Sequence, residues 1–222
     1  MLNEYYYVEL WTGTGCFTQV ARSRNIKVWN TDKFEEFGCS YTGDILDTET
    51  QHKIVEMVDN KYCLGVWMSP VCTKWSMSAG NTYWDEFRMP KREDTYEGIK
   101  MMMFARLIAD ICVKRNKPFF IENPKARASW ILDNQYRKEV WYCQYGDTRA
   151  KPTYIWTNLN IEFRTCKRFV KGQPKHCHHE SAPRGSKTGT QALKGNKERS
   201  VIPLQLFEEI LDHIEQEKVN VK

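Results

Sequence analysis

Residues 5–23 read YYYVELWTGTGCFTQVARS, and this stretch decides the fold. Its first seven residues are rich in aromatic and branched side chains and run straight into Thr12-Gly13-Thr14-Gly15, which predicts a buried strand that ends in a tight turn. We expect the following helix over residues 17–23. Glycines at such a turn let the backbone approach a ligand closely, and the helix presents its N-terminus there. A lone Gly-x-Gly also fits an ordinary strand-to-helix turn, so its interpretation depends on the rest of the chain.

The rest of the chain alternates between strand-like and helix-like patterns. A strand with an acidic C-terminal residue is predicted at 26–32, and Thr48 and Gln51 form a capping-box pattern that opens a helix over 48–58. The remaining predicted elements are a strand at 63–68, a long helix in which Ile99, Met103, Leu107 and Ile111 follow at four-residue steps, a strand at 117–121 that stops at Glu122-Asn123-Pro124, strands at 140–142 and 154–157, and an amphipathic helix over 203–215 with Phe207, Ile210, Leu211 and Ile214 on one face. This alternation predicts an α/β sheet with helices on both faces, which binds ligands beyond the C-terminal ends of its strands.

Composition indicates one compact domain. The 222 residues include 33 Lys and Arg, 28 Asp and Glu, and 41% hydrophobic residues. No apolar run approaches the roughly 18–20 residues that cross a bilayer, and the start MLNEYYYVEL lacks the order of a secretion signal. We therefore expect an intracellular, cytoplasmic protein with no membrane partner, and we interpret its eight irregularly spaced cysteines as reduced thiols.

The positive charge is concentrated in one segment. Residues 164–199 hold ten Lys and Arg and two Asp and Glu, a local charge of +8 in a chain whose net charge is +5. A polar, basic, glycine-containing stretch suits contact with a phosphate backbone. A solvated surface loop fits the charge equally well.

Polar residues follow the predicted strands. Asp32 ends the second predicted strand, and Asp44 follows a predicted third one. Cys72 lies in a loop just past the strand at 63–68, where helix-terminal amides or a cation can favour a thiolate. Glu122 emerges from apolar surroundings that can raise the pKa of a carboxyl group. Each alone has a plainer interpretation: a cap or turn aspartate, a buried thiol, or an ion-paired edge residue.

Taken in order, five segments resemble the cytosine-5 DNA methyltransferase family, in the compact form found in phages and large DNA viruses. The segments are ELWTGTGC at 9–16, DIL at 44–46, SPVCTKWS at 69–76, FIENP at 120–124, and YCQYG followed by KPTYIWTN within 142–158. The resemblance implies a Rossmann-like, S-adenosylmethionine-dependent methyltransferase fold. Its catalytic domain would comprise residues 1–158 and 199–222, and the basic, loop-rich insert 159–198 would be a reduced target-recognition region.

The resemblance also implies the site. S-adenosylmethionine would lie on the turn, with Asp32 near its ribose and Asp44 near its adenine. The residues assigned to cofactor binding are Trp11, Thr12, Gly13, Thr14, Gly15, Asp32, Asp44, Ile45, Ser69 and Pro70. Cys72 would add to carbon 6 of cytosine, which makes carbon 5 able to accept a methyl group, and Glu122 would bind ring nitrogen 3 and the exocyclic amine. The base would be flipped out of duplex DNA.

The chain departs from the family pattern at several places. Val71 precedes the cysteine where proline is usual, and Trp11 stands where phenylalanine is usual. Arg149 and Lys151 occupy the Gln and first Arg positions of a Gln-x-Arg-x-Arg element, and we assign them to catalysis on that alignment. The short insert predicts short or relaxed target specificity. Structured RNA, a free deoxycytidine nucleotide, or a binding protein that has lost catalysis are the alternatives, and restriction protection is the role that the family suggests.

The insert also contains residues of the types that bind zinc. Cys166, Cys177 and His179 are three candidate ligands of a structural zinc site, and Cys143 is an option for the fourth. Their spacing matches no common zinc finger, and a histidine-rich surface loop is the alternative.

Overall fold

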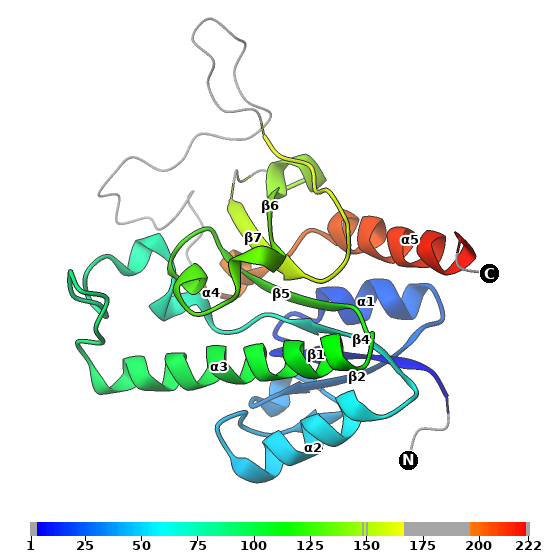
Figure 1. The fold of residues 1–222 in the computed structure, drawn as a ribbon, viewed down its shortest axis with the longest axis horizontal. Coiled ribbons are helices and arrows are strands. Elements are labelled where there is room, and N and C mark those ends of the chain that lie inside the picture. The colour runs from blue at the N-terminus through cyan, green and yellow to red at the C-terminus, as the bar shows by residue number, and fades with distance from the viewer. Residues whose placement is uncertain (1–3, 148, 150, 167–195, 221–222) are drawn as a thin grey trace, which may run out of the picture.

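The computed structural model describes residues 4–147, 149, 151–166 and 196–220, and it forms a Rossmann-like α/β sheet (Figure 1). The strands are β1 Tyr6–Leu10, β2 Lys27–Asp32, β3 Tyr41–Thr42, β4 Cys63–Met68, β5 Phe119–Pro124, β6 Arg137–Trp141 and β7 Pro152–Thr157. The helices are α1 Cys16–Ser23, α2 Thr48–Asp59, α3 Glu93–Lys114, α4 Asn196–Ser200 and α5 Leu204–Asn220. The described strands form one sheet in the order β3-β2-β1-β4-β5-β7-β6.

The centre of the sheet is parallel, as the alternation of strands and helices predicts. β1 pairs with both β2 and β4, and β4 pairs with β5, all in parallel. The chain thus moves outward in opposite directions from β1 and β4, and the crevice between their carboxyl ends is the switch point where such sheets bind ligands. β7 lies between β5 and β6 in the sheet and runs antiparallel to both.

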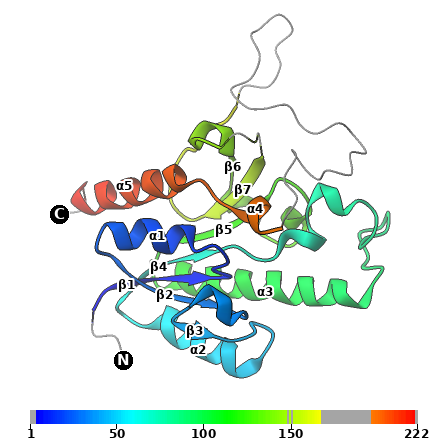
Figure 2. The same ribbon diagram turned by 180° about the vertical axis from the view of Figure 1, so that it is seen from behind.

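Helices cover both faces of the sheet, and each face has its own apolar core. α2 and α3 pack against one face, and α1 and α5 against the other (Figure 1; Figure 2 shows the same layers from behind). On the second face the Trp67 ring lies 4.6 Å from that of Phe207, and Phe17 lies 5.6 Å from Phe207. Aromatic pairs at these distances add roughly 0.5–1.5 kcal/mol each beyond the burial of their surface.

The apolar face of α5 is confirmed, but the four-residue series in α3 does not mark its buried face. Met103 is 59% exposed and Leu107 is 49% exposed, whereas Met102 and Ile108 are fully buried. A four-residue step drifts around a helix of 3.6 residues per turn, so the series leaves the face that contacts the sheet. The helix itself is confirmed.

The start of α2 at Thr48 is confirmed, but the predicted capping box does not form. The N-cap is Asp47, no side chain caps the helix, and Gln51 donates its side-chain N–H to the Ile45 carbonyl at 2.8 Å. The predicted end of β5 before Glu122 was wrong, since Pro124 pairs with Thr153 of β7. Proline is tolerated there because it is the last residue of the strand.

Two further expectations concern the state of the cysteines and the presence of membrane-spanning helices. The seven cysteines within the described part of the chain are free thiols. None of the helices in that part is both long and apolar enough to cross a membrane.

Candidate active site

The glycine turn between β1 and α1 is pinned to the end of β2. Gly13 and Gly15 have φ values of 50° and 67°, in the left-handed region that glycine adopts without strain. The Gly13 N–H donates to Asp32 Oδ2 at 3.0 Å, and the Thr12 hydroxyl donates to the Thr31 carbonyl at 3.1 Å. These contacts hold the turn open at the carboxyl edge of the sheet.

The other two turn residues are held by local contacts. Trp11 also has a positive φ, 55°, which costs a residue with a Cβ roughly 1–2 kcal/mol, and its indole packs against the core beneath α2 and α3. The Thr14 hydroxyl lies 3.2 Å from Cys16 Sγ. The turn is thus a preformed structure that packing sustains.

Glu9 lies buried at the end of β1, beneath the turn. It is 3% exposed and accepts a hydrogen bond from the Thr18 hydroxyl of α1. Burial raises the pKa of Glu9 to about 7, although Thr18 and the Arg22 charge oppose this. A protonatable carboxyl group therefore supports the turn from inside the protein.

The two aspartates assigned to the cofactor lie at the ends of β2 and β3. Besides Gly13, Asp32 accepts the Phe34 N–H at 3.2 Å, and Asp44 accepts the Leu46 N–H at 3.0 Å. Both are partly exposed, so their oxygens keep lone pairs for a ligand. Ile45 is buried, at 3% exposure, and belongs to the apolar core.

The segment after β4 is fixed to its neighbours. The Ser69 N–H donates to the Leu10 carbonyl of β1 at 3.2 Å, and Ser69 Oγ accepts the Trp67 indole N–H at 2.8 Å. Asn123 of β5 is fully buried and donates to the Pro70 carbonyl at 2.9 Å. The sequence analysis assigned no separate role to Asn123, because its partner lies 53 positions away and is reached through the sheet.

Strand pairing brings Cys72 and Glu122 to the same edge of the sheet. Met68 pairs with Ile121, so β4 and β5 reach their carboxyl ends at the same level. Glu122 is the next residue of β5, and Cys72 begins a short 3-10 helix, Cys72–Lys74, in the loop after β4. The two residues that the sequence singled out are thus neighbours in the fold.

The charges of the site act directly on the Cys72 thiol. The residue borders solvent, but the surrounding protein desolvates the thiol and raises its pKa. The charge of Glu122 raises this pKa further, whereas Lys151 and Arg199 lower it. In the resting protein Cys72 is therefore a protonated thiol near two cations.

Glu122 and Lys151 meet around Tyr142, a residue for which the sequence analysis assigned no role. The Tyr142 hydroxyl donates to Glu122 Oε1 at 2.7 Å, and the Lys151 ammonium lies 4.6 Å from the centre of the Tyr142 ring. Lys151 also donates to the Arg199 carbonyl at 3.1 Å. Burial lowers the pKa of Lys151, against the opposing charge of Glu122.

Arg149 is turned toward the protein. It donates from Nε to both Asp147 carboxylate oxygens at 2.9 Å, and its guanidinium also reaches the carbonyls of Glu198 at 3.3 Å and of Arg199 and Val201 at 3.0 Å. Arginine and aspartate are 9% and 11% exposed. Arg149 thus clamps the end of α4 onto the segment that carries Lys151, and no contact joins it to Cys72 or Glu122 among the described residues.

The structure describes part of the predicted zinc site. Cys166 is buried beside Cys143 and Trp141. Cys177 and His179 lie outside the described residues, so the zinc prediction stays a prediction. Within the ranges that the structure describes, no three His, Cys, Asp or Glu side chains gather as metal ligands would.

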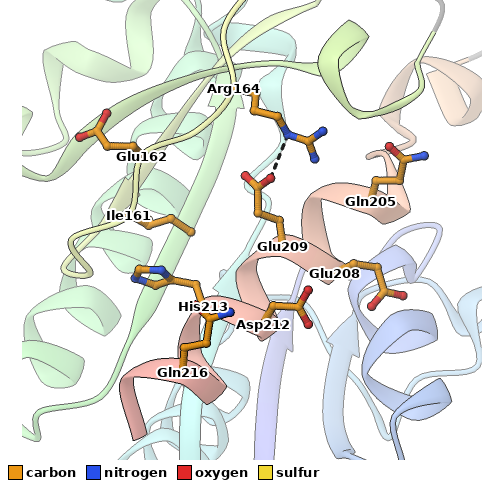
Figure 3. Close-up of a pocket in the computed structure, with 9 residues that line it drawn as sticks. All are labelled: Ile161, Glu162, Arg164, Gln205, Glu208, Glu209, Asp212, His213 and Gln216. Carbon is orange, nitrogen blue, oxygen red and sulfur yellow. Dashed lines mark ion pairs between the residues drawn. The ribbon is translucent and has the colours of Figure 1, made fainter. Parts of the chain in front are cut away.

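Two cavities lie away from these residues. One of about 500 Å³ lies between α5 and the segment after β7, where Arg164 pairs with Glu209 at 2.9 Å (Figure 3). The other, of about 540 Å³, is lined by residues at the end of α1 and along β2, among them Arg22 and Trp29. Neither contains a residue that the sequence assigns to catalysis or to the cofactor.

Known proteins are similar to this chain only in structure. No family model and no curated protein matches the sequence. The similar solved structures include an Entamoeba histolytica methyltransferase, EhMeth (TM-score 0.48, 16% identity, 74% of this chain), the S. pombe Dnmt2 methyltransferase (0.39, 14%, 72%) and a DNMT2 variant from Spodoptera frugiperda (0.39, 14%, 78%). This chain spans 57%, 51% and 56% of their respective lengths.

Proposed function

We propose that this protein is an S-adenosylmethionine-dependent methyltransferase that methylates carbon 5 of cytosine in DNA. The observation that carries the proposal is the meeting of Cys72 and Glu122 at the carboxyl edge of β4 and β5, beside the glycine turn. Cytosine methylation at carbon 5 requires a nucleophile for carbon 6 and a carboxyl group for the opposite edge of the ring. Both groups are present, and their charges interact.

The residues at the turn suit the cofactor. A ribose diol binds acceptors, and the partly exposed carboxylates of Asp32 and Asp44 have acceptor capacity beyond their backbone contacts. A Cβ built on Gly13 would meet nothing closer than the Trp11 carbonyl oxygen at 3.9 Å, so the backbone of the turn is open to close approach. When bound, S-adenosylmethionine supplies an electrophilic methyl group on a sulfonium.

The side chains then divide the chemistry. Cys72 loses its proton to solvent, and its thiolate forms a bond to carbon 6. The electron pair of the double bond between carbons 5 and 6 moves toward ring nitrogen 3, which Glu122 holds together with the exocyclic amine. Carbon 5 takes the methyl group, its proton leaves to solvent, and the bond from sulfur to carbon 6 breaks to restore the ring. Lys151 favours the thiolate, because its positive charge lowers the pKa of Cys72.

The charge distribution supports a nucleic acid substrate over a free nucleotide. Residues 164–199 carry a net +8, and this segment ends at Arg199, whose carbonyl is bound by both Arg149 and Lys151. An enzyme that acts on a free nucleotide does not need a long basic segment, whereas a nucleic acid binds such a segment through its phosphate backbone in a salt-dependent way. Replacing Lys171, Lys175, Arg184 and Lys187 with glutamine should weaken DNA binding and flatten its salt dependence; unchanged affinity would refute this role.

Methyl transfer to four acceptors in parallel tests the proposal. Duplex DNA, single-stranded DNA, RNA and dCMP would each be incubated with the protein and S-adenosylmethionine, and digested nucleosides would be analysed by mass spectrometry. We expect 5-methylcytosine in DNA, none with Cys72→Ala, and a loss of about 10²–10⁴-fold with Glu122→Gln.

Glu139→Gln is the matched control. Glu139 lies on the same sheet but pairs with Lys125 at 2.5 Å, and it should remain active. Product in RNA or dCMP alone would change the substrate and keep the mechanism. Cofactor binding with no product from any acceptor would overturn the proposal and favour a binding protein that has lost catalysis.

A further inference from the structure

Tyr142 is fully buried and touches two groups of the proposed site. Its hydroxyl donates to Glu122 Oε1 at 2.7 Å, and its ring lies beneath the Lys151 ammonium at 4.6 Å. The main chain of Tyr142 is also fixed, because its carbonyl accepts a hydrogen bond from the Asp147 N–H at 3.2 Å. Tyr142 therefore occupies a fixed place between the carboxylate and the ammonium.

The phenol can act only as a donor toward Glu122. Burial raises the pKa of Tyr142 well above 10, and the nearby charge of Glu122 adds to this, so the hydroxyl keeps its proton at neutral pH. An ionised carboxylate accepts hydrogen bonds and has none to give. One Glu122 oxygen therefore accepts a hydrogen bond from inside the protein.

We infer that Tyr142 is a positioning residue, which holds the Glu122 carboxyl group in a fixed orientation toward the substrate. This inference rests on the proposed function, because it deepens the role of Glu122. A side chain that is held in its productive orientation before the substrate binds lowers the barrier to the reaction. The rate of methyl transfer would then depend partly on a phenol that never contacts the substrate.

Tyr145 provides a matched control within the same 3-10 helix, Tyr142–Tyr145. It is 1% exposed, and its hydroxyl donates to Glu209 of α5 at 2.6 Å, away from Cys72 and Glu122. Tyr142→Phe and Tyr145→Phe each remove one buried phenol hydroxyl from a carboxylate. Only the first change alters Glu122.

The test compares kcat and KM for methyl transfer in these two variants and in the wild type. Tyr142→Phe should lower kcat by about 10–100-fold, because a carboxyl group that is no longer held in place reaches the productive geometry less often, while KM for S-adenosylmethionine should not change. Tyr145→Phe should lower the melting temperature without lowering kcat. Tyr142→Phe should have no further effect on the rate in a Glu122→Gln background. A wild-type kcat in Tyr142→Phe, or an equal fall of kcat in both variants, would overturn the inference.

A second measurement does not depend on activity. In protein labelled with ¹³C at the glutamate carboxyl carbon, the Glu122 signal is identified by its loss in Glu122→Gln. At a fixed pH its chemical shift should change in Tyr142→Phe, because that variant removes the hydrogen bond to the carboxyl group, and it should stay in place in Tyr145→Phe. Wild-type protein that transfers no methyl group would refute the proposed function, whereas an unchanged Glu122 signal in Tyr142→Phe would refute the role of Tyr142 alone.

Discussion

Arg149 and Arg115 form two similar ion pairs whose removal should have very different effects. Arg149 and Asp147 are joined by paired hydrogen bonds at side-chain exposures of 9% and 11%. Arg115 and Asp59 are also joined by two hydrogen bonds, at 2.6 and 3.0 Å, but are 57% and 43% exposed. The perturbation is the replacement of each arginine with methionine.

The expected loss for Arg149→Met follows from the burial of its partner. Removing one member of a buried pair leaves an uncompensated charge, which destabilises a protein by about 3–5 kcal/mol. The carbonyls of Glu198, Arg199 and Val201 lose a donor as well. For a chain of this length each kcal/mol lowers the melting temperature by about 2–4 °C, so the total is about 6–20 °C.

Thermal unfolding followed by circular dichroism at neutral pH measures both variants. Arg115→Met should melt close to the wild type, because water solvates the aspartate that is left behind. Burial alone would raise the pKa of Asp147, but the hydrogen bonds from Arg149 lower it below its usual value. The pair therefore stabilises the fold above the unfolded-state pKa, and the difference between wild type and Arg149→Met should narrow as the pH falls through the lowered value. Equal melting temperatures for the two variants at neutral pH would refute this reasoning.

Three further predictions concern single side chains. Glu122→Gln should speed alkylation of Cys72 by iodoacetamide at pH 8, read by peptide mass spectrometry, because it removes a charge that raises the thiol pKa; an unchanged or slower rate would contradict this. The pKa of Glu9 is raised to about 7, so the stability that its protonated form contributes is complete at acid pH and is lost as the pH rises through 7. In urea unfolding, the free energy of unfolding of the wild type should therefore fall by roughly 3 kcal/mol between pH 5 and 8, and Glu9→Gln should abolish this fall. Gly65→Ala should destabilise the fold by about 1–3 kcal/mol in the same assay, because its Cβ would lie 2.8 Å from Pro118; wild-type stability would disprove the close approach.

Much of the fold could be predicted because its strands are short apolar runs that end at polar residues. The strand at 63–68 has the same bounds in the structure, and the glycine turn lies where the sequence indicated. The face of α3 could not be predicted by counting, because both Met102 and Met103 are apolar and only contact with the sheet distinguishes them. Periodicity identified the helix and not its orientation.

The reactive groups of the candidate site could be predicted from the sequence, but the side chains that hold them in place could not. Cys72 and Glu122 follow strand ends, which a local pattern can reveal. Tyr142 was predicted as the end of a strand, and its contact with Glu122 depends on the pairing of β5, β7 and β6. The alignment assigned Arg149 to catalysis, but its interactions in the structure are those of a clamp, which no spacing rule encodes.

The packing of α5 against α1 has a consequence for how the protein is made. Phe17 and Trp67 belong to the first third of the chain, yet their aromatic partner Phe207 belongs to the last helix. During synthesis the part of this face that α5 covers, including the Phe17 and Trp67 rings, stays exposed until the residues of α5 have left the ribosome. A ribosome stalled before that point should therefore carry a nascent chain that is bound by chaperones, and release of α5 should end that binding.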